Sequence, residues 1–100
     1  MTYWQQECGE KLLRTTLEKL TNNKDVNILE DENELFRALK RHLTRKELHA
    51  FCMKEGGKSD ADIAERVSVE LKDVELLLRK AVRKMKQSKV TSEIFTKETE

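Results

Sequence analysis

The stretch from Leu43 to Lys86, LTRKELHAFCMKEGGKSDADIAERVSVELKDVELLLRKAVRKMK, decides the fold, because it indicates three short helices joined by two turns. Thr44 is a preferred helix cap, and Glu47 follows it at the position that completes a capping box. The first of the three helices should therefore begin at Arg45. Its buried side is expected to contain Leu48, Phe51 and Cys52.

Further local signals divide the rest of this stretch. Gly56-Gly57 ends the first helix, because glycine readily adopts the left-handed conformation that closes a helix. Ser59 caps a second helix over residues 60–67. Residues 68–70 form a turn of the length that joins the two helices of a helix-turn-helix. A third helix is expected from Leu71 to Ser88.

The apolar residues of this last helix fall on one side of it. At about 100° per residue, an arc of roughly 140° contains Leu71, Val74, Leu77, Leu78, Ala81, Val82 and Met85. Leu76 lies outside that arc, among Lys72, Arg79 and Arg83. Leu76 has three interpretations: a contact to a thymine methyl group, a contact to another protein, or a lone surface leucine.

Residues 1–36 precede the helix-turn-helix stretch. Apolar residues at steps of three to five predict one amphipathic helix of about four turns, and they are Trp4, Cys8, Leu12, Leu13, Leu17 and Leu20. This apolar side either covers the core of the same chain or meets the same helix of a second chain in a homodimer. Residues 21–25 should form a turn, followed by an extended piece at Val26, Ile28 and Leu29.

Length and composition favour one all-α domain. The chain has 100 residues, no proline and three glycines, and a chain of this size rarely builds two cores. Asp31 caps a further helix, with Leu35, Phe36, Leu39 and Leu43 on its buried side. We therefore predict five helices, divided into an N-terminal amphipathic helix and connection (1–36), a helix-turn-helix domain (37–88) and a polar tail (89–100), which frays unless Phe95 docks.

About half of the chain resembles the C-terminal, region 4-like helix-turn-helix domain of bacterial sigma factors. The matching positions are Ala38-Leu39, Leu43-Thr44, Glu47-Leu48, Gly57, Ser59, Asp62 to Val67, Val69, Val74, Leu77 and Ala81 to Met85. In that family, a small residue at the position of Ala64 lets two helices cross closely, and Val69 fills the turn. The resemblance implies a sigma-like helix-turn-helix fold and a DNA-binding role in transcription regulation.

The same resemblance implies that exposed residues at the start of the last helix enter the major groove. Those positions are Leu71, Lys72, Asp73, Glu75 and Leu76. Two acids among them disfavour an approach to phosphates and to the acceptor-rich edge of guanine, unless a cytosine amino group donates to them. Sequence therefore argues against close base reading at this end of the helix.

Charge distribution fits either a contact with phosphates or a well-solvated helical surface, and charge alone does not decide between them. Residues 1–36 contain four Lys/Arg against eight Asp/Glu, residues 37–89 contain fifteen against eight, and residues 90–100 contain one against three. The last helix region has six basic residues without an intervening acid: Arg79, Lys80, Arg83, Lys84, Lys86 and Lys89. A basic segment is typical of a surface that meets a phosphate backbone. The DNA-binding residues predicted from charge and resemblance are Arg45, Lys46, Lys58, Lys72, Leu76, Arg79 and Arg83.

Other sites are disfavoured. Cys8, Cys52, His42 and His49 lack the paired spacing of a zinc site. No glycine-rich phosphate loop or nucleophile-base pair is evident, so we expect no cofactor and no enzymatic activity. The chain shows neither a secretory pattern nor an apolar run of membrane length, so we expect a cytoplasmic protein with reduced thiols and no membrane partner.

The leading functional prediction is a small DNA-binding transcriptional regulator with duplex DNA as its partner. The alternative is a protein-interaction module on the same scaffold, which binds RNA polymerase, another regulator or itself without binding DNA.

Overall fold

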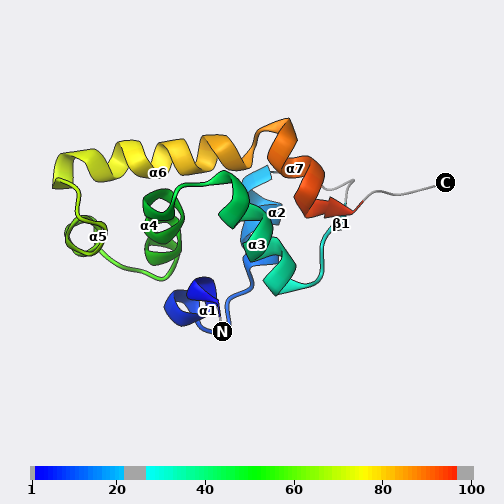
Figure 1. The fold of residues 1–100 in the computed structure, drawn as a ribbon. Coiled ribbons are helices and arrows are strands. Elements are labelled where there is room, and N and C mark those ends of the chain that lie inside the picture. Colours follow the sequence, from blue (N-terminus) through cyan, green and yellow to red (C-terminus); the bar gives the residue numbers. More distant parts are fainter. Residues whose placement is uncertain (1, 22–26, 97–100) are drawn as a thin grey trace.

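The computed structural model describes residues 2–21 and 27–96, which are mostly helical (Figure 1). The elements are α1 (Tyr3–Cys8), α2 (Leu13–Thr21), β1 (Asn27–Ile28), α3 (Glu32–His42), α4 (Arg45–Glu55), α5 (Asp60–Val67), α6 (Leu71–Met85), α7 (Ser88–Ile94) and β2 (Phe95–Thr96). The all-α class is confirmed, but the described residues form seven helices rather than five.

The N-terminal segment differs from the single helix predicted for it. Gly9 has φ 62 and follows the last residue of α1, so the helix ends there. The Trp4 indole donates a hydrogen bond of 2.7 Å to the carbonyl of Lys11, which fixes the bend between α1 and α2. Leu12 lies in this bend and is 47% exposed, so its predicted burial is wrong. Residues 22–26 of the expected turn and extended piece lie outside the described residues.

Helix α4 is the central helix of the structure (Figure 1). Its predicted capping box is present, since the Thr44 hydroxyl accepts from the Glu47 amide and the Glu47 carboxylate accepts from the Thr44 amide. Almost every residue from Glu47 to Met53 is buried. One side of the helix contributes Ala50 and Met53 to the helix-turn-helix core, whereas the opposite side contributes to a larger second core.

The larger core joins all three segments of the predicted division. Trp4 from α1, Leu17 from α2, Leu39 from α3 and Ile94 from α7 belong to the same cluster of buried residues, each at most 1% exposed. The apolar side of the N-terminal segment therefore covers the core of its own chain, which answers one alternative left open by the sequence.

The helix-turn-helix is formed by α5, α6 and the turn between them. Ser59 caps α5 by accepting from the Asp62 amide. Ser68 has a left-handed backbone with φ 61, and the Val69 amide donates to the carbonyl of Ala64 at 3.0 Å. The core of this unit contains Ala50, Met53, Ile63, Ala64, Val67 and Val74, with Val69 packed against it. The predicted three-residue turn and the burial of Ala64 are both confirmed.

The C-terminal part corrects two predictions. Helix α6 ends at Met85 rather than Ser88, and Leu71, expected on its buried side, is 58% exposed. The predicted polar tail begins with helix α7, whose Val90 and Ile94 are fully buried. Strand β2 then pairs antiparallel with β1. None of the helices in the described ranges is long and apolar enough to cross a membrane.

The turn after α4 also fixes the position of α1. Gly57 has φ 91, the conformation that glycine adopts at the end of a helix. Gly56 has an ordinary backbone but no space beside it, because a β-carbon there would overlap the carbonyl of Glu7. The backbone of α1 therefore rests directly on this turn.

The crossing of α5 and α6 can be tested with two alanines of α5. Ala64 is 8% exposed, whereas Ala61 is exposed to solvent. Ala64→Leu should overpack the crossing and lower the free energy of unfolding by about 1–3 kcal/mol. Ala61→Leu should change it by less than about 0.5 kcal/mol. Urea unfolding gives both values, and equal midpoints for the two variants would contradict this packing.

Candidate nucleic-acid interface

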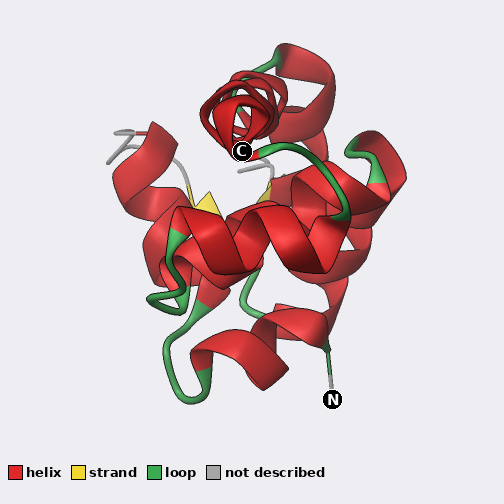
Figure 2. Cartoon of the chain, turned by 90° about the vertical axis from the view of Figure 1, so that its left-hand side faces the viewer, coloured by secondary structure: helices red, strands yellow, loops and turns green. Residues whose placement is uncertain are grey.

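The outward side of α6 presents four of the predicted DNA-binding residues in one row. Helix α6 runs along one edge of the molecule (Figure 1) and is seen nearly end-on above the other helices in Figure 2. At about 100° per residue, these four exposed side chains lie within roughly 60° of one another. We call them the outer stripe: Lys72, Leu76, Arg79 and Arg83. The stripe lies opposite the buried Val74, Ala81 and Met85.

The two acids that sequence analysis placed against DNA binding flank the outer stripe. Asp73 and Glu75 lie on either side of it by the same helical geometry. Glu75 forms an ion pair with Arg79 one turn further along, and their side chains are 77% and 65% exposed. Such an exposed pair contributes little to stability. The row of side chains facing away from the core is therefore free of carboxylates.

A buried carboxylate holds α6 against α4. Glu47 is 4% exposed, and its Oε1 accepts a bond of 2.8 Å from the Thr44 amide and one of 2.8 Å from Lys84 Nζ. Burial of the Glu47 carboxyl opposes its ionisation, but the bonds from Lys84 and Thr44 outweigh this effect and lower its pKa. Sequence analysis found the cap but assigned Lys84 to the phosphate-binding run, and this pairing across 37 residues was missed.

Glu47 variants test this connection. Glu47→Ala removes both bonds and should cost about 2–3 kcal/mol, less than a fully buried pair because Lys84 stays partly solvated. Glu47→Gln keeps an acceptor and should cost about 1 kcal/mol. Because the pKa of Glu47 is lowered from 4.5 in the folded chain, the stabilisation is present above that pH and is lost as pH falls through the lowered value.

Urea midpoints measured between neutral and acid pH check this prediction. The parent should lose stability relative to Glu47→Gln as the pH falls below the ordinary value of 4.5. A constant difference between the two proteins at all pH values would contradict the ionic role of Glu47.

Arg45 and Lys46 lie at the start of α4, beside the end of α5. A hollow of about 300 Å³ is lined by Arg45, Lys46, His49, Arg66, Val67 and Ser68. Lys46 Nζ lies 3.5 Å from the Ser68 carbonyl, so this side chain reaches the helix-turn-helix turn. Arg66 was missed by sequence analysis, and its place in the last turn of α5 was the available signal. Part of its charge is engaged by Glu7 at 3.6 Å.

Lys58 is the one predicted DNA-binding residue that lies neither in the outer stripe nor beside the turn between α5 and α6. It lies half-buried in the loop between α4 and α5, where its amide donates to the Met53 carbonyl at 2.9 Å. Helix α5, about 12 Å long, separates this loop from the turn that leads into α6. The structure therefore gives Lys58 a different position from the outer stripe and from Lys46.

Three of the four side chains considered for zinc have other partners, and the fourth, Cys52, is buried in the larger core. His42 Nε2 lies 2.6 Å from the Glu93 carboxylate, which also accepts from Arg41. The His49 ring stacks on Tyr3 with centroids 4.0 Å apart. Cys8 Sγ lies 3.4 Å from the Cys52 carbonyl oxygen. Within residues 2–21 and 27–96, no three His, Cys, Asp or Glu side chains are placed to hold a metal ion.

Comparison of this chain with family models, with curated proteins and with solved structures finds no match. The sigma region 4-like assignment therefore stays a prediction from sequence. The functional proposal below depends on the helix-turn-helix geometry and on the charges around it.

Proposed function

We propose that this chain is a small DNA-binding transcriptional regulator that inserts α6 into the major groove of duplex DNA. The observation that supports this proposal is the outer stripe, a carboxylate-free row on the helix that follows the helix-turn-helix turn. The major groove of B-DNA is about 12 Å wide and admits one α-helix. The second helix of a helix-turn-helix is the one that enters it.

Most of the affinity would come from phosphates. Arg79 and Arg83 extend from the second half of α6, and Arg45 and Lys46 extend from the start of α4. When such cations contact the phosphate backbone of DNA, they fix the position of the protein on the duplex but do not read its sequence. Leu76, 46% exposed within the stripe, is the residue suited to touch a thymine methyl group. The proposal is thus a binder with strong salt dependence and limited base selectivity.

One observation favours the second candidate, a protein-interaction module without DNA binding. Leu71 and Leu76 are 58% and 46% exposed on the first turns of α6. Exposed apolar side chains of this kind are what a protein contact would cover, although these two lie about 140° apart around the helix axis. The partner would be a subunit of RNA polymerase, another regulator or a second copy of this chain.

The salt dependence of duplex binding tests the leading proposal. Arg83→Ala should weaken binding to every duplex and reduce the slope of log affinity against log salt by about one, for one lost phosphate contact. Lys19→Ala removes the same charge from an exposed position on α2 and should leave the slope unchanged. Gel shift or fluorescence anisotropy at several salt concentrations gives the slopes, and equal slopes for both variants would remove Arg83 from the interface.

A second set of variants separates the two functions. Glu75→Gln removes a flanking acid and releases Arg79, so non-specific DNA binding should tighten. Glu18→Gln breaks the equivalent pair with Arg14 on α2 and should leave it unchanged. Leu76→Ala should alter sequence preference without changing the oligomeric state. Phosphate contacts are strongest at low salt, about 50 mM. If the parent shifts no duplex there, and Leu76→Ala disrupts a complex seen by light scattering, the DNA-binding proposal is rejected in favour of the interaction module.

A further inference from the structure

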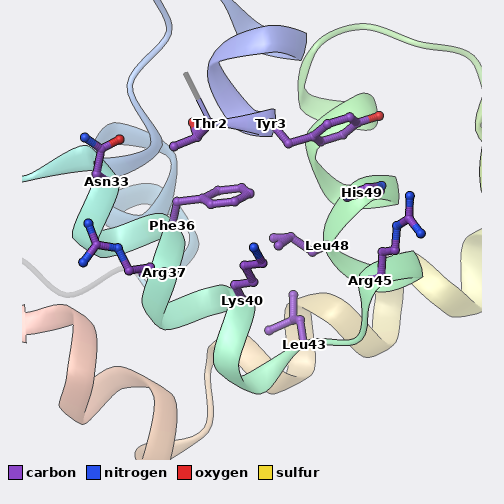
Figure 3. Close-up of a pocket in the computed structure, with 10 residues that line it drawn as sticks. All are labelled: Thr2, Tyr3, Asn33, Phe36, Arg37, Lys40, Leu43, Arg45, Leu48 and His49. Carbon is purple, nitrogen blue, oxygen red and sulfur yellow. The ribbon is translucent and has the colours of Figure 1, made fainter.

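The structure contains a groove of about 730 Å³ between α1, α3 and the start of α4, which the proposed DNA contacts leave unused apart from Arg45 (Figure 3). Volumes of about 300–1,000 Å³ are typical of small-molecule sites. The groove is lined by side chains from three separate parts of the sequence. The groove therefore cannot be predicted from any single stretch of the sequence.

Aromatic and aliphatic side chains form the walls of this groove. Phe36 projects from α3 toward α4 (Figure 3). Leu48 and His49 come from α4, and Tyr3 from α1 stacks on His49. The two rings of the pair are 4.0 Å apart with an interplanar angle of 15°, so each covers one face of the other and only its outer face can meet a planar group. Flat aromatic surfaces favour stacking with a planar group.

The charged residues that line the groove are all cationic. Arg37, Lys40 and Arg45 are exposed, and no Asp or Glu is among the ten lining residues. Within the described residues, none of these three cations forms an ion pair. Other cations do, namely Lys11, Arg41, Lys54, Arg66 and Lys84. Figure 3 shows Lys40 directed toward the middle of the groove and Arg45 beside His49.

His49 reports the positive field at this place. Burial lowers the pKa of its imidazole, and the charges of Arg45 and Lys40 lower it further against an opposing effect of Glu7. At neutral pH the ring is therefore uncharged, which suits it to stack with Tyr3 and with an aromatic ligand.

We propose that this groove binds a small anion with a planar apolar part, such as an aryl carboxylate or a mononucleotide. The planar part packs between Phe36 and the Tyr3–His49 pair, and the anionic group lies between Lys40 and Arg45. Ammonium and guanidinium groups bind carboxylate and phosphate through charge-assisted hydrogen bonds. This proposal goes beyond DNA binding, with which it shares only Arg45, and it is tested without DNA.

Fluorescence titration with anilinonaphthalene sulfonate, a planar aromatic anion, tests the groove on the full chain. The dye should bind with saturation at one site, and its uncharged analogue phenylnaphthylamine should bind at least about tenfold more weakly. Lys40→Ala combined with Arg45→Ala should weaken dye binding by about tenfold, since two charge-assisted contacts are lost. Lys19→Ala combined with Lys54→Ala, which removes two exposed cations elsewhere, should leave dye binding unchanged.

Unfolding midpoints of both double variants confirm that each remains folded, and the ring resonances of Tyr3 and His49 should shift on dye addition. Equal weakening in both double variants, or equal binding of the uncharged analogue, would overturn the proposal. Displacement of the dye by AMP or by naphthoate identifies the source of the ligand. Failure of both to displace it, or equal displacement by inorganic phosphate, would also overturn the proposal.

Discussion

The Glu47 carboxylate is the constraint on which the arrangement of the helices depends. A single oxygen of this side chain closes the first turn of α4 through the Thr44 amide and holds the last turn of α6 through Lys84. One buried acceptor thus caps the start of the central helix and joins it to the last turn of α6. An apolar residue at this position would leave the amide and the ammonium without this acceptor, so the carboxylate specifies the geometry as well as stabilising it.

Helix α4 divides the interior, and this division determines which surfaces remain available. Its Ala50 and Met53 side packs in the helix-turn-helix core, and its Phe51 and Cys52 side packs in the larger core with α1, α2, α3 and α7. The N-terminal helices therefore cover the back of the helix-turn-helix and leave the outer side of α6 exposed. The start of α4 lies where the hollow beside Lys46 meets the groove between α1, α3 and α4, so Arg45 and His49 line both.

Sequence predicted the features that depend on neighbouring residues. The caps at Thr44 and Ser59, the three-residue turn and the spacing of the outer stripe are all local, and the structure contains each of them. The break at Gly9 was missed because the apolar period continues through it. The bend also depends on a contact across it, the bond from Trp4 to the Lys11 carbonyl. Helix α7 was missed because two apolar residues in a polar segment gave too weak a period.

The parts of the candidate sites that sequence did not predict are long-range. Lys84 has the same local context as the basic residues around it, and only the packing of α6 on α4 distinguishes it from them. The groove requires α1, α3 and α4 to meet, which no spacing along the chain indicates. Arg66 likewise joins the surface near Lys46 through tertiary packing.

The absence of a side chain at position 56 has a consequence for how this fold can diverge. Because the Glu7 backbone occupies the place of a β-carbon at Gly56, a descendant chain with any larger residue there must move α1 away from the turn. Such a chain could keep the helix-turn-helix, whose own core does not include that position. It would lose the wall that Tyr3 provides, so residue 56 distinguishes relatives that retain the groove from those that retain only the scaffold.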